Sequence, residues 1–196
     1  DLNKKSIESL TMSGALDCFG IDRGVILANS EAIPTFAAEH RKSASSSQGG
    51  LFDDIGYKSS HLKLDMKAPA ADRMQKLTWE KDLLGFYLSE HPLDVHEEKI
   101  TAQKAVTVSN LAGKPSREIK VAGVVSNVKK IIAKNGKAMA FARLEDKTSN
   151  VELVIFGDVY EKNPEMWVQN AVVLVSAKPQ MRDGELKLIA NEAVLL

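Results

Sequence analysis

The strongest constraint on the fold is a change in the hydrophobic pattern close to residue 116. Beyond it, short segments rich in β-branched residues alternate with turn signals, a pattern typical of a sheet of short strands. The clearest turn is KNGK at 134–137, because Asn-Gly readily takes the positive φ values of a type I′ hairpin turn. The expected strands span 119–132, 138–146, 151–156, 171–179 and 185–196, with a short helical insert at 157–167.

Three strands, a helix and two further strands follow one another in the order of an OB-fold, a five-stranded Greek-key barrel. In that fold, strands 2 and 3 and the loops after strands 1 and 4 are presented to oligonucleotides. A small barrel without a nucleic-acid role is the alternative. Gly123, inside the long first strand, predicts a bulge or a sharp bend at that point.

The residues before 116 follow a helical period. Ile7 and Leu10 predict a first helix that breaks near Gly14. Asp22 is a suitable N-cap for a second helix, which Pro34 is expected to interrupt or kink.

A later helix is predicted from an apolar stripe, and Pro92 is expected to end it because a residue before proline avoids the α region. The stripe consists of Met74, Leu77, Leu84 and Leu88. Asp94, followed by Glu97, is typical of a capping box that starts another short helix. The expected fold class is therefore α+β, with helices at 1–42, a flexible segment at 43–69, a helical linker at 70–115 and the barrel at 116–196.

Composition narrows the classes of function. The 196 residues include 26 basic and 26 acidic ones, so no overall field points to a polyanionic partner. The single cysteine, Cys18, excludes an internal disulfide, and the four histidines are too scattered for a zinc site. No long apolar run, phosphate-binding loop or dinucleotide motif is present in the sequence. We therefore expect no metal, cofactor, small-molecule substrate or membrane contact.

Three blocks of the sequence resemble, in family order, the alpha subunit of bacterial DNA polymerase III. The blocks are SIESLTMSGALDCFG at 6–20, EKDLLGFYLSEHPLD at 80–94 and KNGKAMAFARLEDKTSNVELVIFGDVYE at 134–161. The resemblance implies a C-terminal fragment that begins at the end of the tandem helix-hairpin-helix region, in agreement with a first residue that is not Met. It also implies that the catalytic carboxylates lie upstream, so the fragment itself is not expected to polymerise DNA. Its location would be the bacterial cytoplasm, in association with the nucleoid.

The resemblance gives a meaning to SASSSQGGLFDD at 43–54, a linker-like segment that contains two large apolar residues. Alpha subunits bind the ring-shaped sliding clamp, the beta subunit, through a short internal peptide at this position. Gln48, Leu51 and Phe52 match its Gln-x-x-Leu/Met-Phe pattern. The alternative, which composition alone favours, is that Leu51 and Phe52 pack against the protein's own helices.

The barrel is expected to bind single-stranded DNA with basic side chains along the phosphates and an aromatic side chain under a base. The candidate residues are Lys129, Lys130, Lys134, Lys137, Phe141, Arg143 and Arg182. Alternation along the second strand places Phe141 outside the barrel, whereas a bulge would place it in the core. Two rival functions remain: a replisome module whose barrel docks another subunit without contacting DNA, and a hydrolase with an OB appendage. Backbone N–H groups at Gly14 or Gly20 are weaker candidates for contacts with duplex phosphates.

Overall fold

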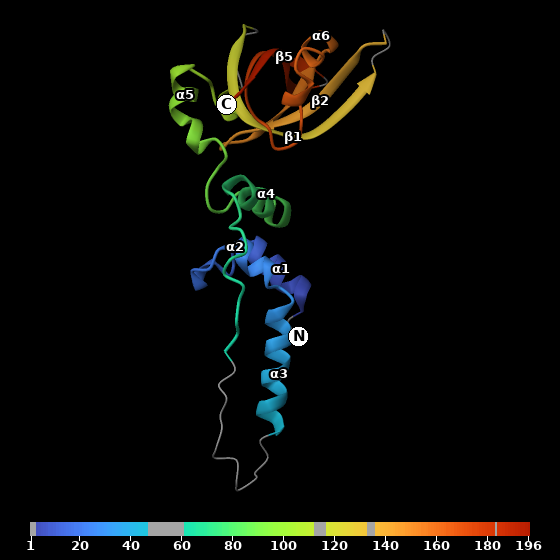
Figure 1. Ribbon diagram of the computed structural model, residues 1–196. Coiled ribbons are helices and arrows are strands. Elements are labelled where there is room, and N and C mark those ends of the chain that lie inside the picture. The colour runs from blue at the N-terminus through green and yellow to red at the C-terminus, as the bar shows by residue number, and fades with distance from the viewer. Residues whose placement is uncertain (1–2, 47–60, 112–116, 133–135, 183) are drawn as a thin grey trace. The chain divides into compact units, whose positions relative to one another are not determined.

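The computed structural model describes residues 3–46, 61–111, 117–132, 136–182 and 184–196 (Figure 1). These residues form two compact units, 1–89 and 90–196, so the division falls inside the region expected to be a helical linker. Each unit has a hydrogen-bonded framework of its own, and each is described separately below.

The first unit consists of helices whose ends have clear chemical causes. They are α1 (Lys4–Met12), the 3₁₀ turn η1 (Asp17–Phe19), α2 (Arg23–Ala28), α3 (Ala32–Ser46) and α4 (Arg73–Leu84). Gly14 follows α1 with φ +85°, which confirms the predicted break. Asp22 accepts a hydrogen bond from the Gly24 N–H at 2.8 Å, which confirms it as the N-cap of α2.

Two predicted helix boundaries were wrong. Pro34 does not interrupt a helix, because it lies in the first turn of α3, where a proline breaks no intrahelical hydrogen bond. The interruption falls at 29–31 instead. Similarly, α4 ends at Leu84, well before Pro92, because Gly85 takes a left-handed conformation with φ +82° and ends the helix.

A buried ion pair joins α2 to α4. Arg23 and Glu80 are 4% and 0% exposed, and Nη2 of Arg23 lies 2.9 Å from Oε1 of Glu80. Arg23 also donates to Asp17, with Nε 2.9 Å from Oδ1 and Nη2 2.6 Å from Oδ2. Oε2 of Glu80 accepts the backbone N–H groups of Leu88 and Ser89, at 2.8 and 2.9 Å. Both charges are therefore paired, and Glu80 fixes the path of the chain just after α4.

The second unit contains a closed five-stranded barrel. Its strands are β1 (Ile119–Ile132), β2 (Ala138–Glu145), β3 (Asn150–Ile155), β4 (Val172–Arg182) and β5 (Glu185–Leu195). They neighbour one another in the order β1-β2-β3-β5-β4, with β3 and β5 parallel and the other neighbouring pairs antiparallel. The short helix α6 (Gly157–Tyr160) and the 3₁₀ turn η4 (Pro164–Met166) connect β3 to β4. This order confirms the predicted OB-fold.

Of the two features predicted at Gly123, a bulge or a sharp bend, the bulge is wrong, because β1 does not bulge at this residue. Gly123 pairs regularly with Val173, and a Cβ at this position would lie 2.6 Å from Cγ of Leu144. Glycine is therefore required there by the close approach of a core side chain. The bulge lies between Ser126 and Lys129, where Asn127 has φ +49°.

Residues 90–111 pack onto the barrel unit and include η2 (Asp94–His96), α5 (Glu97–Ala102) and η3 (Val108–Leu111). The predicted short helix is thus present, but Asp94 does not cap it. The Asp94 carboxylate instead accepts the His91 N–H at 2.7 Å and pairs with Lys147 at 2.5 Å. Close by, Asp146 accepts the Val108 N–H at 2.7 Å, so the turn between β2 and β3 holds this segment in place.

Candidate nucleic-acid interface

The position of Phe141 follows from the alternation of side chains along β2. Ala140, Ala142 and Leu144 are buried in the barrel core, whereas Phe141 is half-buried and Arg143 is exposed. The bulge lies on β1 and not on β2, so the alternation along β2 is unbroken. Phe141 therefore lies on the outer face of the barrel, and the alternative that placed it in the core is wrong.

Strand register builds two parallel rows of side chains on this outer face, because residues paired across neighbouring strands point to the same side. We call the first the apolar row: Phe141, Val154 and Ile189, with Lys129 at one end and Lys178 at the other. Val154 has no exposed surface although it points outward, so neighbouring side chains cover it. The apolar row is thus a packed, partly covered platform with a cation at each end.

We call the second the charged row: Arg143, Glu152 and Lys187, which lie in register on β2, β3 and β5. Nζ of Lys187 lies 2.9 Å from Oε1 of Glu152, with exposed side-chain fractions of 18% and 39%. Arg143 is exposed on the strand next to Glu152. The row carries a net single positive charge beside the apolar row.

The other predicted basic residues are distributed differently. Lys130 pairs with Ala140 and so points to the inner side, where its Nζ lies 5.6 Å from the centroid of the Tyr160 ring. Lys137 lies 2.6 Å from Asp158, whose hydrogen bond and charge raise the pKa of Lys137. Arg182 is exposed at the end of β4, opposite Glu185. Lys134 lies outside the described residues.

The structure thus brings Lys129, Phe141 and Arg143 together and adds Lys178 and Glu152, which the sequence did not indicate. Lys178 reaches this face only through the register of β4 with β5, which shifts by one residue between Ser176 and Ala177. No local pattern in the sequence reveals such a shift, because it depends on strands that meet in the folded barrel.

The remaining predicted binding groups are the clamp-binding peptide and two backbone N–H groups. Gln48, Leu51 and Phe52 fall outside the described residues. The N–H groups of Gly14 and Gly20 donate to the carbonyl oxygens of Thr11 and Asp17, both at 3.0 Å. These two donors are therefore engaged within the protein, which argues against the suggested phosphate contacts.

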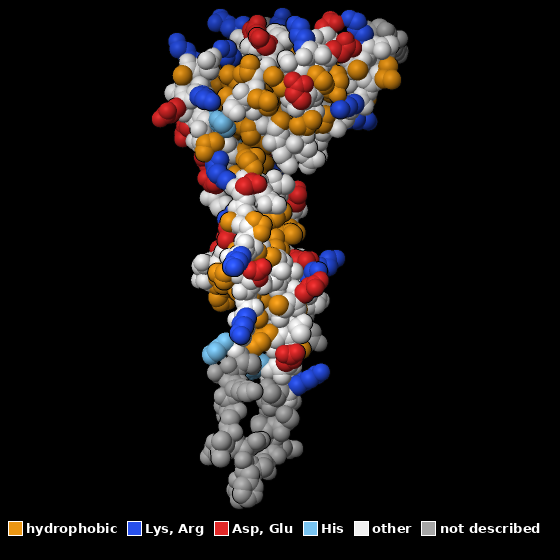
Figure 2. Space-filling model, in the orientation of Figure 1, with side chains coloured by type: hydrophobic (Ala, Val, Ile, Leu, Met, Phe, Trp, Pro, Cys, Tyr) orange, Lys and Arg blue, Asp and Glu red, His pale blue; other side chains and the backbone are white. Residues whose placement is uncertain are grey.

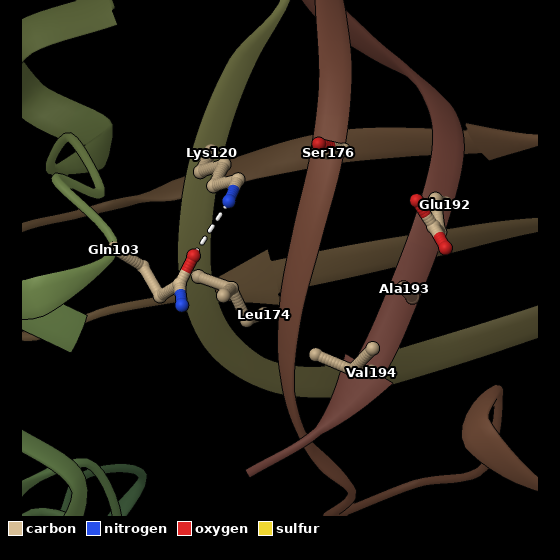
Figure 3. A pocket seen from close by; sticks show the side chains of 7 residues that line it. All are labelled: Gln103, Lys120, Leu174, Ser176, Glu192, Ala193 and Val194. Atoms are coloured by element: carbon tan, nitrogen blue, oxygen red, sulfur yellow. Dashed lines mark hydrogen bonds between the residues drawn. The ribbon is translucent and has the colours of Figure 1, made fainter. Parts of the chain in front are cut away.

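A pocket of about 230 Å³ lies on another side of the barrel, over β1, β4 and β5 (Figure 3). In it, Nζ of Lys120 donates to Oε1 of Gln103 at 2.5 Å, and Glu192 and Val194 extend from β5. No aromatic side chain is among its described lining residues, so it offers no platform for a base. The outer face with the two rows is the better candidate for nucleic acid.

The overall charge distribution is mixed. Figure 2 shows acidic and basic side chains interspersed over the visible surface of the barrel unit. Among the described residues, no cluster of histidine, cysteine or acidic side chains is arranged to hold a metal ion. Nor does the described part of the chain contain a helix long and apolar enough to span a membrane. The sequence holds equal numbers of basic and acidic residues, so local rows of side chains are the electrostatic features to consider for DNA binding.

Comparison with known proteins agrees with this architecture. Residues 119–196 match the family described as an OB-fold nucleic acid binding domain. The DNA polymerase III subunit alpha of Bacillus subtilis is 31% identical over 199 residues, which cover 100% of this chain and 17% of that protein. The corresponding subunit of Mycobacterium tuberculosis is 32% identical over 198 residues, or 97% of this chain and 17% of that protein.

Among solved structures, the mitochondrial single-stranded DNA binding protein Rim1 of S. cerevisiae covers 42% of this chain and 97% of its own, at 14% identity and a TM-score of 0.36. The sequence relatives are decisive, because they match nearly the whole chain, although the chain spans only 17% of their length. Together with the OB barrel, they show that this chain belongs to the DNA polymerase III alpha-subunit family and corresponds to a part of those subunits that contains the OB domain.

Proposed function

We propose that this chain is a non-catalytic part of a bacterial replicative polymerase that binds single-stranded template DNA on the outer face of its barrel. The observation that carries the proposal is Phe141, an outward aromatic side chain on an apolar row with Lys129 and Lys178 at its ends. A base stacks on Phe141 and the flanking phosphates lie near the lysines, the arrangement by which OB-folds hold single strands.

The same polymerase would be tethered to the sliding clamp by Gln48, Leu51 and Phe52. Support comes from the peptide pattern, its position between the first helices and the barrel, and the family of the chain. Each apolar anchor contributes roughly 1.5–3 kcal/mol when fully buried in a partner's pocket. Ordering a linker-like segment opposes this gain, so the affinity is expected to be moderate. The protein would act in the bacterial cytoplasm, in association with the nucleoid. Other replisome subunits are further candidate partners.

The DNA proposal is tested by titrating labelled oligothymidylate with the wild-type chain and with Phe141→Ala at low salt. Loss of the stacking platform should weaken binding by about 1–3 kcal/mol. Phe19→Ala is the matched control, because Phe19 is a 68% exposed aromatic residue in the first unit. If wild-type protein binds no single strand even at low salt, the DNA proposal fails and the protein-docking alternative is favoured.

The clamp proposal is tested separately, by clamp pulldown with Gln48, Leu51 and Phe52 replaced together by Ala. Capture should be lost with the triple variant and kept with Phe141→Ala, since the two proposed sites do not share residues. Undiminished capture of the triple variant would refute the peptide assignment.

A further inference from the structure

A carboxylate occupies the middle of the face proposed to bind DNA. Glu152 on β3 pairs with Arg143 on β2 and with Lys187 on β5. Its partner Lys187 is the more buried of the two, with 18% of its side chain exposed against 39% for Glu152. The Glu152 carboxylate is therefore more accessible to solvent and to an approaching ligand than the Lys187 ammonium group paired with it.

Glu152 also lies next to the apolar row. Val154 follows it by two residues on the same strand, so their side chains point to the same face about 6.6 Å apart. The cations of that row, Lys129 and Lys178, lie at its ends, on β1 and β4. The face thus has positive ends and, beside its apolar centre, a negative charge.

We propose that Glu152 makes this face select single-stranded over double-stranded DNA, an inference that rests on the proposed function. A single strand can turn its bases toward Phe141 and keep its phosphates near Lys129 and Lys178. A duplex has its bases paired inside and presents a closely spaced array of phosphates, some of which must approach Glu152. The carboxylate repels those phosphates, and it also neutralises Lys187 and partly offsets Arg143, which would otherwise attract them.

The experiment compares a labelled oligothymidylate strand with a labelled blunt duplex of equal length, at several salt concentrations. Glu152→Gln removes the charge and keeps the size of the side chain, and Glu152→Asp keeps the charge. Glu98→Gln is the matched control, because it makes the same change in net charge at an exposed position on α5.

Glu152→Gln should strengthen duplex binding about threefold at low salt, the effect of one like charge at roughly 6 Å in water. Single-strand binding should change less, and the salt dependence for the duplex should become steeper. Glu152→Asp should keep the wild-type preference for the single strand over the duplex. A merely structural role would instead weaken binding to both probes.

The proposal is overturned if Glu152→Gln behaves like Glu98→Gln, or if it changes the affinity for both probes by the same factor. Failure of the proposed function gives a different result, since the wild-type chain would then not bind the single strand at all.

Discussion

The guanidinium of Arg23 and the carboxylate of Glu80 form a buried ion pair with Nη2 and Oε1 2.9 Å apart. Burial by itself raises the pKa of Glu80, but hydrogen bonds from Ser89, Leu88 and Arg23 outweigh it and lower the pKa. The carboxylate is therefore ionised at neutral pH and holds Arg23 and the turn after α4 in place.

Glu80→Ala should destabilise the first unit by about 3 kcal/mol, because it leaves a buried guanidinium with a single carboxylate partner and two backbone N–H groups without acceptors. Hydrogen exchange followed by mass spectrometry over α1, α2 and α4 measures the effect in the intact chain. Glu39→Ala, at an exposed position on α3, should change exchange little. Equal protection in the two variants would contradict a structural role for the pair.

Lys129 and Lys130 are neighbours in sequence but should differ in their effect on DNA binding. Lys129 shares the outer face with Phe141, whereas Lys130 lies over the Tyr160 ring on the inner side. Lys129→Ala should reduce the salt slope of oligothymidylate binding by about 0.7, the value for one phosphate contact with a single strand. Lys130→Ala should leave the slope unchanged. A similar loss in both variants would mean that DNA does not follow the apolar row.

Asp146 should make the stability of the barrel unit depend on acid pH. Burial raises its pKa, but hydrogen bonds from the Thr148 hydroxyl and the Val108, Ser149 and Thr148 N–H groups outweigh burial and lower the pKa. The ionised carboxylate therefore stabilises the fold above the unfolded-state pKa of about 3.9, and this contribution is lost as the pH falls through the lower folded-state value.

Asp146→Asn should lower the free energy of unfolding at pH 7 by about 1–2 kcal/mol, because one amide replaces an acceptor of several hydrogen bonds. Urea unfolding at pH 7 and pH 3 should show a smaller pH dependence for the variant than for the wild type. Glu165→Gln, which removes a carboxylate at an exposed position on η4, should keep the wild-type dependence. An unchanged dependence in Asp146→Asn would refute the assignment.

Gly123→Ala should destabilise the barrel by about 1–3 kcal/mol, because the new Cβ would lie 2.6 Å from Cγ of Leu144 and 2.9 Å from the Glu145 carbonyl oxygen. Thermal unfolding of Gly123→Ala, Leu144→Ala and the double variant tests the contact. The double variant should lose less stability than the sum of the single variants, because removing the Leu144 side chain relieves part of the clash. Strict additivity would show that the two positions are not coupled.

Local sequence was sufficient for much of the fold. Gly14 and Asp22 mark helix boundaries through their own backbone and side-chain preferences, and the Asn-Gly turn and β-branched runs predicted all five strands and their barrel. The two wrong boundaries were predicted from Pro34 and Pro92, and neither proline ends a helix in the structure. Pro34 fits the first turn of a helix, and Gly85 ends α4 before Pro92 is reached.

The sequence by itself determined the OB-fold and the family resemblance, because both depend on the order of segments along the chain. Only the tertiary structure decided which side chains share a face. Phe141 is outside because the bulge lies on β1, Lys178 joins it through a register shift between β4 and β5, and Glu152 meets Lys187 across the parallel pair of β3 and β5. Register in a closed barrel depends on all neighbouring strands together, so residues distant in sequence become neighbours that no local pattern specifies.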